Sequence, residues 1–291
     1  MGHGIRYAGV EVTLVVATDG SASEPTSDER RICGTTGLAI VRSDGRSAWR
    51  IAKTSYGPLQ PIRRGIKWDR SDWNRYDVPG HQTVYAATPT VAAYGESLAY
   101  LRAGLDKTKL SQVFDETSED HFDGQQSIQE AVAAEWAEMN FQAPGTLNAG
   151  WRHARALYEL KLPNHGWFID IQDAESLAAL RRRLSHPLRA LNVSTLTLSH
   201  LTGEDRRLTT SIADWLWRVT LDDGQTAHGI KYSSKYGSNW TCWALWMRSD
   251  SANHPLTAQA IKSAPGLEIR PCQNNPDLQS ARNVLGLNYC F

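Results

Sequence analysis

The sequence lacks features that mark several common classes of protein. None of its four cysteines form a C-x-x-C pair, which argues against a structural zinc site. Four cysteines in 291 residues are also too few for a disulfide framework, so we expect a reducing, cytoplasmic location. The formal net charge is zero because 31 Lys and Arg balance 31 Asp and Glu. A neutral chain argues against a broad surface for nucleic acid or anionic lipid.

Long apolar runs and the familiar catalytic motifs are absent too. The N-terminal run VEVTLVVAT is too short to span a membrane, has no basic region immediately before it and is typical of a strand. There is no Walker motif, no H-E-x-x-H and no G-x-S-x-G, and the glycines of MGHGIRYAG are not spaced as a dinucleotide fingerprint. The acidic segment 113–126 lacks the spacing of a calcium loop, so we interpret it as solvated. We therefore expect no metal, no resident cofactor and no membrane segment.

The composition and the apolar patterns predict a globular α+β domain. The chain is 41% hydrophobic and 21% charged, which suits a protein with a sizeable core. Branched and aromatic runs predict strands at 83–88, 154–162 and 166–171, and a hairpin formed by a strand within 222–234 and a second at 240–247. Helical spacing is found at 90–103, 128–139, 173–184 and 203–221, with Thr88 and Asp173 as caps and Gly104 as a stop.

Tryptophan is abundant, with eleven in the chain. Large aromatic side chains dominate protein cores by buried area, so we favour core packing as the interpretation. A stacking wall for a planar ligand is the alternative. Five of the tryptophans crowd one region: Trp215, Trp217, Trp240, Trp243 and Trp246.

One carboxylate interrupts the helical segment 90–103. Glu96 is the only Asp, Glu, Lys or Arg between Asp77 and Arg102. Its neighbours on the helix face are alanines, whereas a solvated face usually carries several charged residues. Either Glu96 is simply on the solvated face, or it lies on the floor of a cleft, where a partly desolvated carboxylate needs a specific partner. On a helical wheel it lies opposite the apolar stripe formed by Val91, Tyr94, Leu98 and Leu101.

Three further segments carry candidate residues in a fixed order around Glu96. Taken singly, each residue has an ordinary structural role, such as a surface cation, a core tyrosine or a turn hydroxyl. The order Arg…Arg-aromatic-Asp…Tyr…Glu…Tyr-x-Ser resembles the RES-domain family, named for its arginine, glutamate and serine, over roughly residues 46–250. The segments are AWRIAK with Arg50, NRYDVPGHQTVYAAT with Arg75 and Tyr85, and GIKYSSKYG with Tyr232, Ser234 and Lys235.

The match to the family has departures and open alternatives. Asn74 stands where the family commonly has glycine, and Lys235 stands where an arginine often follows the serine. The separation between the glutamate and the serine is long. Lys67, in Lys-Trp-Asp, is an alternative to Arg75 as the anchor, and Ser233 is an alternative to Ser234.

The resemblance implies a RES domain, with a mixed α/β core similar to that of ADP-ribosyltransferases and a central cleft. Its extent implies an N-terminal extension at 1–45, a catalytic domain at 46–250 and a C-terminal tail at 251–291 that packs on the domain. It further implies that the protein degrades NAD⁺ by hydrolysis or phosphorolysis, as the toxin of a RES–Xre toxin–antitoxin pair. The implied partners are NAD⁺, inorganic phosphate where phosphorolysis applies, and an Xre-family antitoxin.

The residues in the matching segments suit that chemistry. Cleavage of the nicotinamide–ribose bond passes through an oxocarbenium-like species, whose positive charge a carboxylate stabilises. Guanidinium forks match pyrophosphate oxygens, a tyrosine ring can stack on nicotinamide, and a serine hydroxyl can bond the carboxamide or a phosphate. The resemblance implies Glu96, Arg75, Tyr85 and Ser234 as catalytic residues, and Arg50, Tyr232 and Lys235 as substrate-binding residues, with Lys235 available for phosphate as the acceptor.

Three other functions compete with NAD⁺ degradation. A protein mono-ADP-ribosyltransferase would use the same pocket and differ only in the acceptor. A non-catalytic interaction protein would use the tryptophans as a partner surface. A glycosidase would need two carboxylates, and Glu96 has no obvious companion in the sequence.

Overall fold

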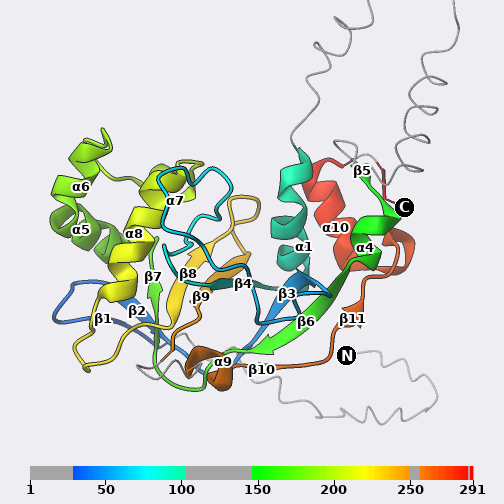
Figure 1. Ribbon diagram of the computed structural model, residues 1–291, viewed down its shortest axis with the longest axis horizontal. Helices are drawn as coiled ribbons and strands as arrows, with labels where there is room; N and C mark the ends of the chain where they lie inside the picture. The colour runs from blue at the N-terminus through cyan, green and yellow to red at the C-terminus, as the bar shows by residue number, and fades with distance from the viewer. Residues whose placement is uncertain (1–28, 103–145, 250–255, 288, 291) are drawn as a thin grey trace, which may run out of the picture.

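The computed structural model describes residues 29–102, 146–249, 256–287 and 289–290. Its main element is a curled sheet of ten strands in the order β1-β2-β7-β8-β9-β4-β3-β6-β10, with β11 also paired to β6 (Figure 1). Neighbouring strands are antiparallel except β7 and β8, which are parallel. The strands are β1 (Arg30–Ile32), β2 (Ala39–Arg42), β3 (Ser47–Lys53), β4 (Thr83–Thr88), β6 (Arg155–Lys161), β7 (Trp167–Asp170), β8 (Gly229–Ser233), β9 (Thr241–Trp246), β10 (Lys262–Ser263) and β11 (Leu267–Glu268); β5 (Thr146–Leu147) and β12 (Tyr289–Cys290) pair separately.

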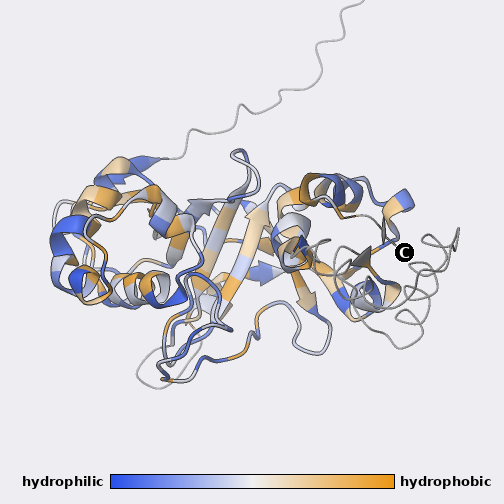
Figure 2. Ribbon diagram, turned by 90° about the horizontal axis from the view of Figure 1, so that it is seen from above, coloured by the Kyte–Doolittle hydropathy of each residue, from blue (hydrophilic) through white to orange (hydrophobic). Residues whose placement is uncertain are grey.

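Helices gather at the two ends of the sheet (Figures 1 and 2). One group lies in the crossover that parallel strands β7 and β8 require: α5 (Ala174–Arg183), α6 (Ser185–Ala190), α7 (Leu198–Thr202) and α8 (Arg206–Arg218). The other group is α1 (Thr90–Leu98) with its continuation η1 (Ala99–Arg102), α4 (Ala149–His153), η2 (Cys272–Asn274) and α10 (Pro276–Leu285). The short helix α9 (Leu256–Ala260) precedes β10.

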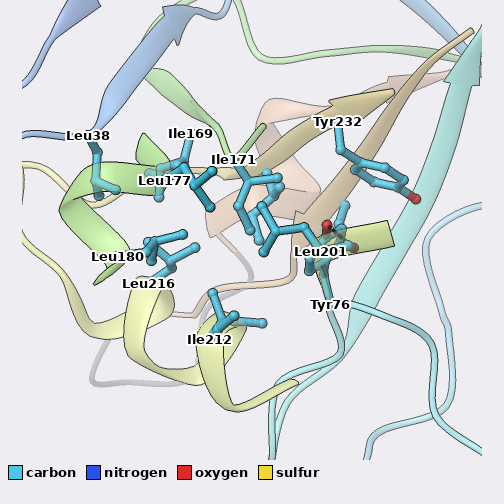
Figure 3. Close-up of a cluster of buried hydrophobic side chains, with 14 of the residues drawn as sticks. Leu38, Tyr76, Ile169, Ile171, Leu177, Leu180, Leu201, Ile212, Leu216 and Tyr232 are labelled. Atoms are coloured by element: carbon cyan, nitrogen blue, oxygen red, sulfur yellow. Dashed lines mark hydrogen bonds between the residues drawn. The ribbon is translucent and has the colours of Figure 1, made fainter. Parts of the chain in front are cut away.

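The buried side chains form separate clusters for the two helix groups. The larger cluster joins one face of the sheet to α5–α8, and Figure 3 shows Leu180, Ile212 and Leu216 of these helices beside Ile169 of β7. A second cluster unites α1 and α10 with β6. Within it the Asn275 amide donates to the Tyr94 hydroxyl at 2.9 Å, which ties the start of α10 to α1.

Most of the predicted elements that fall on described residues are confirmed. The predicted strands correspond to β4, β6 and β7, β8 and β9 form the predicted hairpin, and Asp173 caps α5 by accepting from the Glu175 N–H. Thr88 is not the cap of α1, because Pro89 occupies that position and the Thr88 hydroxyl donates to the Ser47 carbonyl at 3.1 Å. The predictions for the N-terminal run VEVTLVVAT, for Gly104 and for 113–126 and 128–139 lie outside the described residues.

The first strands belong to the same sheet as the rest of the domain. β1 and β2 precede residue 46, yet Ile40 of β2 pairs with Ile169 of β7 in the main sheet. The expected boundary at residue 45 therefore separates strands of one sheet. At the other end of the chain, residues 256–287 pack on the domain through Ile269, Leu278 and Leu285 in the cluster around α1.

The five tryptophans that crowd one region of the sequence pack in or against the core. Trp240, Trp243 and Trp246 are buried, and Trp215 and Trp217 are partly buried against the larger cluster, which confirms the core interpretation.

Cys33 and Cys242 are buried free thiols, whereas Cys272 is disulfide-bonded. A small number of cysteines thus did not exclude a disulfide.

Candidate functional site

A cavity of about 660 Å³ opens where the two helix groups face each other across the sheet. Its walls come from β3, β4, α1, the β8–β9 hairpin, the loop before β4 and the turn between α7 and α8. The described structure brings all seven predicted site residues to this place, although they come from distant parts of the chain. Six line the cavity, namely Arg50, Arg75, Tyr85, Glu96, Tyr232 and Lys235, and the seventh, Ser234, bonds to Glu96.

Glu96 faces the cavity from α1 and is held there by Ser234. The Ser234 hydroxyl donates to Glu96 Oε1 at 2.5 Å and accepts from the Tyr236 N–H at 3.0 Å. Ser233 is exposed, so Ser234 is the serine that meets the glutamate. Ala93 also lines the cavity, which shows that the small-residue face of the helix is a cavity wall and not a solvated surface.

A tryptophan between two glycines sets the distance between α1 and the hairpin. A Cβ on Gly95 of α1 would lie 2.2 Å from the Trp240 ring, and one on Gly237 would lie 2.9 Å from it. Trp240 is buried, so its ring has little room to withdraw. Only glycine at both positions allows the ring to fit between α1 and the turn that presents Ser234 to Glu96.

We expect Gly95→Ala to destabilise the protein. Alanine is favoured over glycine inside a helix by about 1 kcal/mol, but overpacking a fixed ring typically costs about 1–3 kcal/mol. The net loss should appear as a lower urea midpoint. Gly65→Ala is the matched control, since a Cβ at Gly65 meets nothing within 4 Å. A midpoint for Gly95→Ala above that of Gly65→Ala would show that the Trp240 ring yields freely and that only the gain in helix propensity remains.

Asp77 organises the loop that carries Arg75. Its buried carboxylate accepts from Arg64 Nε at 2.5 Å, from the Asn74 N–H at 2.9 Å and from the Tyr85 hydroxyl at 2.9 Å. Burial raises the pKa of Asp77, although all three donors favour its ionised form. The Tyr85 hydroxyl is therefore engaged in the loop, and the ring is the part of Tyr85 available to a ligand.

Two arginines line the cavity, and each has a buried Nε–H group without a hydrogen bond. Arg75 is only 7% exposed, with its guanidinium carbon 5.7 Å from the Tyr232 ring centroid. Arg50 donates to the Tyr85 carbonyl at 3.1 Å. The Nε of each arginine is buried without a hydrogen bond, and no described carboxylate forms a salt bridge with either. Lys67 is exposed and paired with Asp72, so Arg75 is the cation of this loop that reaches the cavity.

The electrostatics of the two guanidinium groups differ. Burial lowers the pKa of Arg50 to about 10. Burial also acts to lower the pKa of Arg75, but Tyr76, Tyr232 and two cavity carboxylates, one of them Glu96, outweigh it and raise the pKa. Arg75 is thus a charged group held in place by its surroundings.

Several cavity residues were missed by sequence reasoning. Glu204 and Arg206 come from the turn before α8 and its first residue, and Trp49 and Cys242 come from β3 and β9. Glu204 accepts from Arg206 at 2.6 Å and also forms an ion pair with Lys235, so the amine of Lys235 is already paired. Burial raises the pKa of the Cys242 thiol well above its usual value.

No described group of three or more His, Cys, Asp or Glu side chains has an arrangement that could hold a metal ion. Across the described ranges, no helix has the length and apolar character needed to cross a membrane. In comparisons with known proteins, no family model, curated protein or solved structure matches the chain.

Proposed function

We propose that the protein cleaves the nicotinamide–ribose bond of NAD⁺, with water or phosphate as the acceptor, as the resemblance to RES-domain enzymes implies. The observation that carries the proposal is that Glu96, oriented by Ser234, shares one cavity with Arg50 and Arg75. A carboxylate beside two guanidinium groups with unpaired N–H groups suits a ligand that has both a pyrophosphate and a site of developing positive charge.

Glu96 is the group for the reacting ribose. When the bond from C1′ to nicotinamide breaks, its electron pair leaves with the ring nitrogen, which becomes neutral. The positive charge moves to the ribose as an oxocarbenium-like species, and the carboxylate stabilises it. Water or phosphate then attacks C1′. Because nicotinamide is already cationic as a leaving group, the step needs neither a strong general acid nor a Lewis acid.

The arginines and aromatic rings are the groups for binding. Arg75 offers a guanidinium fork fixed by its loop, and Arg50 offers a second one from β3, so together they can clamp the pyrophosphate. The Tyr85 ring lines the cavity and can stack on nicotinamide. Tyr232 is buried, with its ring 4.9 Å from that of Tyr76, so it supports the wall on which Arg75 lies.

Identification of the products tests this proposal. Purified protein is incubated with NAD⁺ in phosphate and in chloride buffer, each with and without EDTA. We expect free nicotinamide in every arm, with ADP-ribose 1″-phosphate only if phosphate is the acceptor. With NAD⁺ that carries a radiolabel in its ADP-ribose part, nicotinamide release together with transfer of the label to protein would instead indicate a mono-ADP-ribosyltransferase. If no nicotinamide is released, the non-catalytic interaction protein is the remaining interpretation. Loss of nicotinamide release in the arms with EDTA would contradict a mechanism that needs no metal.

The toxin role, an Xre-family antitoxin as partner and a cytoplasmic location are part of the same proposal. The toxin role and the antitoxin partner follow from the resemblance alone, and the location follows from the small number of cysteines. NAD⁺ loss in cells that express the wild-type protein, without loss in cells that express a Glu96→Gln variant, is the expected cellular result.

A further inference from the structure

Glu204 bridges two cations in the wall of the cavity. Its Oε2 accepts from Arg206 Nη2 at 2.6 Å, and its Oε1 forms an ion pair with Lys235 Nζ. All three residues line the cavity, and the glutamate side chain is 64% exposed. A single carboxylate on an exposed turn therefore bridges two cations of the cavity wall.

Arg206 is fixed independently of this carboxylate. Its Nε donates to the Trp73 carbonyl at 3.0 Å, and its Nη1 donates to the Gly203 carbonyl at 3.1 Å. These two bonds to the backbone hold the guanidinium in place when the carboxylate withdraws. Nη2 is then free to donate to another oxyanion in the same position.

The place of Arg206 in α8 conflicts with local helix electrostatics. It is the first residue of the helix, after the N-cap Asp205, and the first turn contains no acidic residue. The helix dipole disfavours a cation at this end. Conflicts of this kind between a residue and its local structure are expected at functional positions.

A third cation, Arg75, lines the same cavity. Glu204 contributes to raising the pKa of Arg75, while its own pKa is lowered first by Lys235 and then by Arg206 and Arg75. Withdrawal of the glutamate would leave Arg206 and Lys235 without their shared carboxylate, in a cavity that Arg75 also lines. Phosphate, with up to two negative charges and several acceptor oxygens, suits such a position better than a single carboxylate does.

We propose that Arg206 and Lys235 form a second anion subsite of the cavity, which takes a phosphate group, and that Glu204 occupies this subsite until the anion displaces it. The carboxylate then sets the phosphate concentration at which the subsite fills. The role of this subsite as the acceptor site for phosphorolysis rests on the proposed function. Its ability to bind an anion does not rest on that function and is tested without NAD⁺.

Titration with inorganic phosphate tests the subsite. Melting temperatures of the full chain are measured at increasing phosphate and constant ionic strength, because surface charge effects change with salt. The dependence of the shift on ligand concentration gives an apparent Kd. We expect the apparent Kd of Glu204→Gln for phosphate to be at least ~10-fold lower than that of the wild type. Glu204→Ala is a second variant with the same expected gain.

Two controls make the result specific. Glu268→Gln makes the same charge change on exposed strand β11 and should leave the affinity unchanged. Lys235→Met, added to Glu204→Gln, should abolish the gain. An equal gain in Glu268→Gln, or a gain that survives Lys235→Met, would overturn the subsite. Either result would leave the proposed NAD⁺ cleavage standing, just as a failure to cleave NAD⁺ would leave the phosphate site standing.

Discussion

Glu96→Gln should reduce turnover of NAD⁺ by at least ~10²-fold, the scale of losing one preorganised stabilising group. The substitution keeps the size of the side chain, and the amide oxygen of glutamine can still accept from Ser234, as Glu96 Oε1 does at 2.5 Å. Only the negative charge is lost. Since that charge acts mainly on the transition state, the affinity for NAD⁺ should change little. Single-turnover rates and equilibrium binding of NAD⁺ separate the two quantities.

The same variant also distinguishes an electrostatic role from a structural one. No described Lys or Arg forms a salt bridge with Glu96, so its removal breaks no ion pair. Removing a partly desolvated charge is neutral or mildly stabilising, and we expect the melting temperature to be maintained. Glu268→Gln, on an exposed strand, is the matched control and should retain full turnover. Full turnover in a stable Glu96→Gln protein would contradict the assigned role.

The local elements that build the site were predictable because their signals lie close together in the sequence. In TVYAATPTVAAYGESL, a branched and aromatic run ends at a proline, and apolar residues then recur at helical spacing. The structure places β4 and α1 on these two parts. The single failure there, Thr88 as the cap, arose because its hydroxyl satisfies a carbonyl of the neighbouring strand. That strand is distant in sequence, so the competing bond had no local signal.

The composition of the cavity wall was predictable only in part. The unusual helix face around Glu96 and the three ordered motifs indicated six of the residues that line the cavity. Glu204 and Arg206 gave no such signal, because a turn with charges before a helix is ordinarily solvated. The one available clue was an arginine at the first position of a helix whose first turn contains no acidic residue. The packing of Gly95 on Trp240 could not be foreseen either, since no local pattern pairs a glycine with a distant ring.

The two cavity arginines differ in how their surroundings hold them. Arg50 extends from β3, which is paired on both sides, whereas Arg75 depends on a loop that Asp77 braces through three hydrogen bonds. That loop brings the guanidinium close to Tyr232 and leaves its Nε buried without a partner. Burying an N–H without a hydrogen bond costs about 1–3 kcal/mol. This cost is part of what the fold spends to hold the Arg75 guanidinium at the cavity.

Arg75→Lys should therefore raise the KM for NAD⁺ at least ~10-fold, even though the charge is kept. Lysine has no planar fork and cannot make two parallel hydrogen bonds to phosphate oxygens. Hydrogen bonds to charged groups contribute about 1.5–3 kcal/mol each, so losing one accounts for the change. Steady-state kinetics measure the effect, with Arg63→Lys as the control, because Arg63 lies on the same loop, is exposed and donates to the Gly80 carbonyl. A KM equal to that of the control would show that Arg75 does not clamp the pyrophosphate, and the phosphate contacts would then fall to Arg50.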